Sequence, residues 1–379
     1  MVRHARPVRI RHRVLLAAAA VFAVAVGVGL VAFGRDEEPA AAPVPVVSAT
    51  GSSGPPPPAP SISSIAPAAS TTSAPPAPTT TPPAPRSKAL YVDPTGAAAK
   101  QVKDYKAAGR AADAALIEKI ANRPVATWFA DSSPGGASRA RTLVTNAGKA
   151  GKLPILTLYN IPHRDCSGQS AGGAASGDEY KSWISAMAGA LKGRESLVVL
   201  EPDAVAQAVQ GCLDEDRKSQ RYDLLSYAVS TLKANAGTRV YLDAGNPTWI
   251  TDTAQLAAAL RLAGIEQGNG FTLNVANFET TQSNVTYGTA LSGQLSGTKF
   301  VVDTSRNGNG PAAQGPQGNE HWCNPAGRKL GDLPTTGTGN DLVDAYLWIK
   351  RPGESDGACG NGAPAAGQWW ADYALELAR

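Results

Sequence analysis

The chain has 379 residues, with 35 Lys plus Arg against 31 Asp plus Glu, four His and a formal net charge of +4. Five of the cations are arginines within residues 1–13, so the rest of the chain is slightly acidic. A nucleic-acid-binding surface would need basic residues clustered on the folded part, and no nucleic-acid partner is expected. Two histidines also lie in this basic tip, which excludes zinc chemistry built on clustered imidazoles. No metal or organic cofactor is expected.

Residues 14–34 contain 21 apolar or glycine positions without a charge. A helix that spans a bilayer needs about 20 such residues, whereas the apolar core of a secretory signal has roughly 7 to 15. The arginines before this segment predict that its N-terminal side stays in the cytoplasm. Residues 1–34 are therefore interpreted as a cleaved signal peptide or an uncleaved signal anchor, which would be the only membrane contact. Both interpretations place the remainder outside the cell, secreted or anchored to the outer face of the cytoplasmic membrane.

Residues 35–87 form a Pro/Ser/Thr-rich segment. Within residues 39–85 there are 15 of the 29 prolines and 14 Ser or Thr. Such a composition cannot bury a core and favours extended polyproline geometry. The segment is expected to be a disordered linker.

Residues 88–379 have the composition of one folded domain, expected to act as a monomer, and contain all four cysteines. An even number of exported cysteines without a CxxC pair indicates two disulfides. Three connectivities are possible. The sequence-neighbour pairs, Cys166 with Cys212 and Cys323 with Cys359, are favoured.

Seven short apolar runs predict strands that are covered on both faces, because they are nearly continuously hydrophobic. Ala- and Leu-rich stretches of helical period separate them, which indicates a parallel sheet with crossover helices. The predicted strands lie within residues 125–131, 153–160, 196–203, 239–245, 270–278, 299–306 and 344–350.

All seven runs end on polar or aromatic residues. In an open sheet only the strands beside the switch point need functional ends, whereas a barrel brings every C-terminal end to one mouth. The expected fold is therefore a distorted seven-stranded parallel (β/α) barrel. A mouth rich in carboxylates and aromatic rings, with almost no histidine, is typical of sites that cleave glycosidic bonds.

Two aspartates stand just after predicted strands, Asp165 in YNIPHRDC and Asp203 in EPD. Two carboxylates that face each other in a dry cleft cannot both ionise easily, so one can serve as an acid near neutral pH. The alternative is that both are helix caps. Pro202 favours a shaped strand exit over a routine cap. Asp303 and Arg306, after another strand, are expected to form a structural ion pair, and Trp369 and Trp370 are expected to pack in the core.

Longer motifs surround these strand ends. They are TWF, YNIPHRDC, LEPDA, YLDAGNPTW, NVANF, VVDTSRNGNGP, HWCNPAGRKLG, DAYLWIKRPGESDGACG and GQWWADYALELA. In this order, from about Tyr91 to the C-terminus, they resemble the catalytic domain of glycoside hydrolase family 6, the cellulases that cleave β-1,4-glucan with inversion. The resemblance implies the same two disulfides that the spacing favours.

The resemblance also implies roles for individual residues. Asp203 matches the general acid, and Asp165 matches the carboxylate that keeps Asp203 protonated and stabilises positive charge on the sugar. Asp356 matches the proposed base, the alternative being a chain of waters in which Asp165 takes part. Tyr159 matches the tyrosine beneath the distorted sugar, and Asp243 matches a carboxylate that orients the surroundings of the acid.

Further residues are candidates for binding the sugar chain. The resemblance implies stacking for Trp128, Trp249 and Trp322 and hydrogen bonding for Lys350 and Glu354. Asp243 and the amides Asn246 and Asn277, which lie in the same motifs, complete the expected substrate-binding set. Ala171 stands where many members of the family carry serine in a mobile loop.

The resemblance therefore predicts that the protein is an inverting endo-β-1,4-glucanase, which hydrolyses internal bonds of cellulose or a related β-glucan. Only Gly357 and Ala358 separate Asp356 from Cys359, where chain-end enzymes of the family insert a long loop, so an open cleft is expected. The alternatives are an exo-acting cellobiohydrolase, a non-catalytic exported glucan-binding protein, and a cell-envelope structural protein on a stalk.

Overall fold

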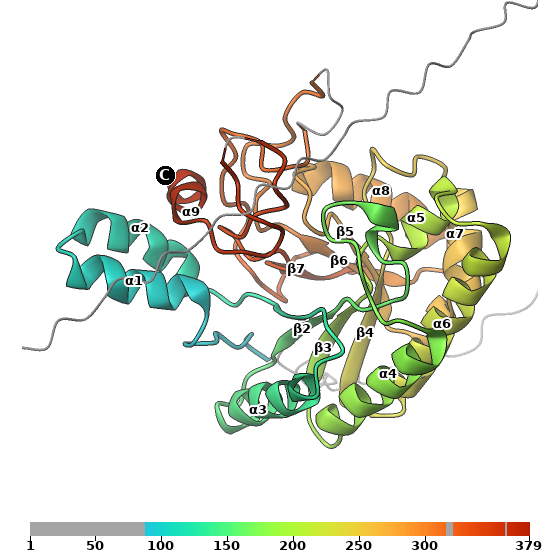
Figure 1. Ribbon diagram of the computed structural model, residues 1–379. Helices are drawn as coiled ribbons and strands as arrows, with labels where there is room; N and C mark the ends of the chain where they lie inside the picture. Colours follow the sequence, from blue (N-terminus) through green and yellow to red (C-terminus); the bar gives the residue numbers. More distant parts are fainter. Residues whose placement is uncertain (1–87, 316–320, 361) are drawn as a thin grey trace, which may run out of the picture. The chain divides into compact units, whose positions relative to one another are not determined.

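Seven parallel strands form one sheet in the computed structural model, which describes residues 88–315, 321–360 and 362–379 (Figure 1). The expected leader, residues 1–34, and the expected linker, residues 35–87, lie outside the described residues. Each predicted apolar run overlaps one strand, with β4 and β7 beginning one residue before the predicted run, and the strands pair in chain order. They are β1 (Thr127–Phe129), β2 (Ile155–Leu158), β3 (Ser196–Leu200), β4 (Thr238–Asp243), β5 (Gly270–Leu273), β6 (Lys299–Asp303) and β7 (Val343–Leu347).

The sheet curls toward closure between its first and last strands. The backbone N–H of Ala126, just before β1, donates to the carbonyl of Trp348, just after β7, at 2.9 Å. Among the described residues no strand ladder joins β7 to β1. The fold is thus an incompletely closed (β/α) barrel, which confirms the predicted class and its distortion.

Alternate residues of most strands enter two different cores, as the period of two in a strand requires. In β3, Val198 and Leu200 pack against the surrounding helices in the outer core. Leu197 and Val199 point the other way, into an inner core formed by residues of the sheet and the segments beside it. Both faces are buried, which explains the continuous hydrophobicity of the runs.

Helices connect β1 to β6 in turn and cover the outer face of the sheet, whereas no helix of the described residues lies between β6 and β7 (Figure 1). Polar side chains accept backbone N–H bonds at the start of several helices: Ser176 at α4, Asp214 at α6, Asp252 at α7 and Thr280 at α8. The helices are α1 (Ala97–Ala107), α2 (Ala111–Ala121), α3 (Gly135–Lys149), α4 (Gly177–Leu191), α5 (Ala204–Gln210), α6 (Glu215–Lys233), α7 (Thr253–Leu262), α8 (Thr281–Gln294) and α9 (Ala371–Ala378), with 3₁₀ turns η1 (Asp165–Ser167) and η2 (Ile265–Gln267).

A third, smaller core joins the two ends of the described domain. Helices α1 and α2 pack with α9, which places the first and last helices together (Figure 1). Trp369 packs against this core, and its indole N–H donates to the Gln101 side chain at 3.0 Å. Trp370 stacks on Tyr373 with 5.4 Å between ring centroids. Trp369 therefore packs against a core as predicted, whereas Trp370 is half-buried and stacks on Tyr373 outside the core clusters of the described residues. In the part of the chain described, no helix is long and apolar enough to cross a membrane.

Candidate active site

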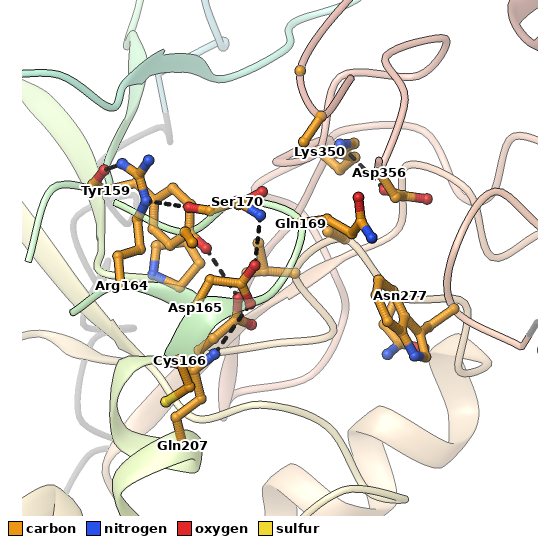
Figure 2. A pocket seen from close by; sticks show the side chains of 18 of the residues that line it. Tyr159, Arg164, Asp165, Cys166, Gln169, Ser170, Gln207, Asn277, Lys350 and Asp356 are labelled. Atoms are coloured by element: carbon orange, nitrogen blue, oxygen red, sulfur yellow. Dashed lines mark hydrogen bonds and ion pairs between the residues drawn. The ribbon is translucent and has the colours of Figure 1, made fainter. Parts of the chain in front are cut away.

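A cleft of about 920 Å³ lies at the C-terminal ends of the strands. Eleven of the twelve residues that the sequence predicts for the site line this cleft, and Figure 2 labels five of them: Tyr159, Asp165, Asn277, Lys350 and Asp356. The twelfth, Asp243, is not part of the lining and accepts the backbone N–H of Asp203. The eleven are Trp128, Tyr159, Asp165, Asp203, Asn246, Trp249, Asn277, Trp322, Lys350, Glu354 and Asp356. The strand topology thus brings together side chains that are spread over most of the domain.

Asp203 follows β3 with a left-handed backbone, φ 70°. It stands at the N-terminus of α5, yet its side chain caps no helix N–H, so the helix-cap alternative does not apply to it. Instead the Tyr159 hydroxyl donates to Asp203 Oδ2 over a long 3.4 Å. Desolvation, and then the negative charge of Asp165, raise the pKa of Asp203 to about 7. Asp203 can therefore hold a proton near neutral pH and present it to the cleft.

Asp243, at the end of β4, supports Asp203 from behind. Its Oδ1 accepts the backbone N–H of Asp203 at 2.9 Å and that of Gly245 at 3.1 Å. Its Oδ2 is buried and has no hydrogen-bond partner among the described residues. Burial and the neighbouring Asp203 raise the pKa of Asp243 well above its usual value. Its contacts are with the backbone that carries Asp203, and its side chain does not line the cleft.

Asp165 is held in a tight loop after β2. Its Oδ2 accepts the backbone N–H of Ser170 at 2.6 Å, and its Oδ1 accepts Nε2 of Gln207 at 3.4 Å (Figure 2). The loop closes at Gly173, which has φ 98° and where a Cβ would lie 1.9 Å from the carbonyl oxygen of Ile161. Only glycine fits there.

Arg164 anchors the same loop. Its guanidinium lies 4.6 Å from the centroid of the Tyr159 ring and donates to the carbonyls of Tyr159, Ala130 and Ser170. Trp128 meets Tyr159 edge to face, with 5.4 Å between centroids. The Trp128 indole N–H donates to the carbonyl of Ile349, which fixes this ring against the end of β7. Two aromatic rings thus form one wall of the cleft.

Asp356 lies across the cleft from Asp165 (Figure 2). Arg306 donates to its Oδ2 at 2.8 Å, and Nζ of Lys350 lies 3.2 Å from its Oδ1. Burial acts to raise the pKa of Asp356, but the charges of Arg306 and Lys350 outweigh burial and hold that pKa below its usual value. Asp356 is therefore an ionised carboxylate at neutral pH.

The predicted ion pair between Asp303 and Arg306 is wrong. Arg306 is fully buried and pairs with Asp356 instead. Asp303 accepts backbone N–H groups of Ser305, Ile349 and Lys350, which tie the ends of β6 and β7 together. The sheet places the end of β7 beside β6, so a partner 50 residues away in sequence is nearer to Arg306 than one three residues away.

The remaining predicted residues also line the cleft. Trp249 donates its indole N–H to Gln210 at 3.1 Å and remains partly exposed. Glu354 pairs with Arg351 at 2.8 Å, and burial raises its pKa. The side-chain oxygens of Asn246 and Asn277 accept nearby backbone N–H groups. Trp322 is half-buried and also lines the cleft.

Several residues that shape the site were not predicted. Gln207 faces Asp165 from α5, and its position four residues after Asp203, one helical turn away, could have indicated it. Buried Glu201 accepts the N–H groups of Asn160 and Ile161, and burial raises its pKa to about 7. Arg164 adjoins Asp165 in the RDC motif, but its contact with the Tyr159 ring had no sequence signal.

Both disulfides pair as the sequence analysis favours, Cys166 with Cys212 and Cys323 with Cys359. The first adjoins Asp165. The second lies against Asn324, whose backbone N–H donates to Asp356. Each cross-link is thus within one or two contacts of a cleft carboxylate.

Comparison with known proteins agrees with this geometry. A profile of the family described as Glycosyl hydrolases family 6 matches residues 85–379. Endoglucanase A of Cellulomonas fimi is 45% identical over 296 residues, which cover 76% of this chain and 61% of the relative. Endoglucanase 1 of Streptomyces halstedii is 42% identical, with 76% of this chain and 88% of the relative covered. The chain thus spans less than two thirds of the length of the Cellulomonas protein.

Among solved structures, the endoglucanase Cel6 from Mycobacterium tuberculosis, in complex with methyl-cellobiosyl-4-deoxy-4-thio-β-D-cellobioside, is similar with a TM-score of 0.72 and 42% identity. The match covers 77% of this chain and 97% of that structure. Because the family profile extends over the whole described domain, the chain belongs to glycosyl hydrolase family 6.

Proposed function

We propose that the protein is an inverting endo-β-1,4-glucanase that hydrolyses internal bonds of cellulose or a related β-glucan. The observation that carries this proposal is the pair of unlike carboxyl groups in one aromatic-walled cleft. Asp203 has a pKa raised to about 7, whereas the pKa of Asp356 is held below its usual value. When two carboxyl groups in one site have pKa values shifted in opposite directions, the group with the raised pKa is typically the acid and the other is its ionised partner.

In the proposed reaction Asp203 gives its proton to the glycosidic oxygen as the bond to the anomeric carbon breaks. A water molecule attacks that carbon from the opposite face and loses a proton. Asp165 and Asp356 assist this attack. Both oxygens of Asp356 contact cations, which makes it a poor proton acceptor and favours a role in orienting water. Asp165 lacks a cation contact of this kind among the described residues and is the better terminus for a proton passed along water.

The substrate class is supported by the site and by the relatives. Trp128, Trp249 and Trp322 in the cleft lining suit stacking on the apolar faces of sugar rings. Two relatives are named endoglucanases, and the Mycobacterium structure is described with a thio-linked cellobioside ligand. We infer a β-1,4-glucan substrate, a catalytic domain over residues 88–379 acting as a monomer, and no cofactor.

The proposed location is outside the cell, with residues 1–34 as leader or anchor and residues 35–87 as linker. Two disulfides support export, because such bonds persist in oxidising compartments. Cell fractionation tests this, and protein recovered only from the cytoplasm would contradict it.

One observation favours a second candidate, a chain-end-acting cellobiohydrolase. A Cβ at Gly357 would lie 2.6 Å from the Gln169 side chain, so the loop after Asp165 reaches across to the segment after Asp356. A glucan chain that enters the cleft from the side would have to separate Gln169 from the Gly357 segment, whereas a glucan chain that enters end first would not. The short segment between Asp356 and Cys359 favours the endo proposal, since little chain is available there to form a roof.

Viscosity separates the two modes of attack. For the endo enzyme we expect a rapid fall in the viscosity of carboxymethylcellulose while few reducing ends have formed. Release of cellobiose with nearly unchanged viscosity would reverse the assignment to the chain-end mode.

Release of reducing ends from a β-1,4-glucan tests the function itself. Wild-type protein should release them, and Asp203→Ala should be slower by roughly 10²- to 10⁴-fold, as expected for loss of a general acid. Asp341→Ala, at an exposed position outside the cleft lining, is the matched control and should keep wild-type activity. Glucan binding without hydrolysis by the wild type would support the non-catalytic binding protein instead.

A further inference from the structure

Arg221, on α6, is a buried cation that the proposed reaction does not use. Its side chain is 2% exposed, and no ion pair within the described part of the chain includes it. A buried guanidinium is unfavourable unless hydrogen bonds replace the lost water. Its partners therefore indicate what holds it there.

Those partners belong to two segments that carry catalytic carboxylates. One terminal nitrogen of Arg221 donates to the carbonyls of Pro162 and His163, at 3.0 and 2.7 Å. The other lies 3.3 Å from Oε1 of Gln207 and 3.4 Å from the carbonyl of Ala204. Pro162 and His163 begin the loop that bears Asp165, and Ala204 follows Asp203. A single side chain thus connects the Asp165 loop to the helix behind Asp203.

Arg221 also determines which way the Gln207 amide points. A guanidinium can only donate, so the amide oxygen must face Arg221 and the NH₂ group must face away. That NH₂ group is directed at Oδ1 of Asp165 (Figure 2). Because an ionised carboxylate can only accept, the chain from Arg221 through Gln207 to Asp165 is consistent in donor and acceptor at every step.

The loop has a second tether on the other side of Asp165. Cys166, the next residue, is bonded to Cys212 after α5. Before Asp165, Arg221 holds the backbone at Pro162 and His163, in addition to the bonds that Arg164 and Glu201 make to the same segment. Asp165 therefore lies between restrained backbone on both sides.

We propose that Arg221 is a positioning residue of the hydrolase, which fixes the loop backbone and the Gln207 amide and thereby sets the place of the Asp165 carboxylate in the cleft. This inference rests on the proposed function, in which Asp165 assists water attack. It assigns Arg221 no contact with substrate.

Steady-state kinetics on a soluble β-glucan tests the proposal. Arg221→Met should lower kcat by about 10- to 100-fold with KM within about 2-fold, since misplacing a catalytic group slows the reaction without removing sugar contacts. Arg221→Lys, which keeps the charge but not the fork of donors, should fall between Arg221→Met and wild type. If Arg221→Met does not fold, Arg221→Lys replaces it in the test: a lowered kcat with KM within about 2-fold supports the proposal, and a wild-type kcat overturns it. Arg217→Met, an exposed arginine one turn away on α6, is the matched control.

A double-mutant cycle distinguishes positioning from general stability. If Arg221 acts through Asp165, its replacement in an Asp165→Asn background should change kcat by less than about 2-fold. Equal losses in both backgrounds, or wild-type kcat in folded Arg221→Met, would overturn the proposal.

Hydrogen exchange gives a readout that does not depend on activity. The amides of residues 163–170 should exchange faster in Arg221→Met, most clearly Ser170, whose N–H is bonded to Asp165. If the wild type does not hydrolyse β-glucan, the proposed function fails, and exchange still decides whether Arg221 holds the loop. Unchanged exchange at these amides would refute the positioning role.

Discussion

At the scale of single residues, the site depends on backbone conformations that non-glycine residues rarely adopt. Asp165 and Asp203 have φ of 58° and 70°, and Glu201 has φ of 49°. Such left-handed residues cost of order 1–3 kcal/mol each and concentrate at functional sites. At the end of β3 they turn the chain so that Asp203 lies in the cleft while Glu201 is buried beneath the neighbouring loop.

The raised pKa of Asp203 predicts the alkaline side of the pH profile. A carboxyl group whose pKa rises from 3.8 to about 7 keeps its proton below about pH 7 and loses it above. Because the protonated form is the acid, kcat/KM should fall about tenfold for each pH unit above that value. Replacing Asp165 by Asn removes a negative charge that raises this pKa, so the alkaline limb should move to lower pH.

Glu201 provides the internal check on this prediction. Its pKa is also raised to about 7, by burial, but Asp165 is not among the main causes. A pH–rate profile of Asp165→Asn, measured on its residual activity, therefore separates the two groups. If the alkaline limb of kcat/KM does not move in Asp165→Asn, the titrating group is Glu201, and the proposed role of Asp203 is contradicted.

At the scale of elements, the sequence predicted the strands well because the central ones are buried on both faces. The burial pattern of β2 and β3 is continuous, whereas β7 alternates between buried and half-buried residues. The loops were less predictable. Contacts such as Arg306 with Asp356 or Gln169 with the Gly357 segment join residues from different strand ends, and local sequence carries no signal for them. The resemblance assigned roles to the carboxylates but left their supporting partners unidentified.

The disulfides offer a prediction about these loops. They close segments of similar length, with sequence separations of 46 and 36 residues. In the chain-entropy account each should contribute at most about 4 kcal/mol. The double variants Cys166→Ser with Cys212→Ser, and Cys323→Ser with Cys359→Ser, should each lose about 2 to 4 kcal/mol of unfolding free energy in urea denaturation. A loss below about 1 kcal/mol in either would mean that residual structure already restrains that segment in the unfolded chain, and would contradict the chain-entropy account.

At the scale of the whole molecule, parallel strands in chain order explain why the site assembles. Every C-terminal strand end lies at one edge of the curled sheet, so residues from Trp128 to Asp356 line one cleft. The seven strands, their direction and this convergence were predictable from apolar runs and polar ends. The degree of closure was not, because it depends on how far the sheet twists and on contacts such as Ala126 with Trp348.

The central claim is that Asp203 protonates the leaving oxygen while water attacks from the opposite face. Proton NMR of the first product released from a soluble β-1,4-glucan oligosaccharide tests it most directly, because the anomeric signals report the face of attack before mutarotation. The account predicts the α-anomer first, produced by the wild type and at least 10²-fold more slowly by Asp203→Ala. The β-anomer as first product would contradict it.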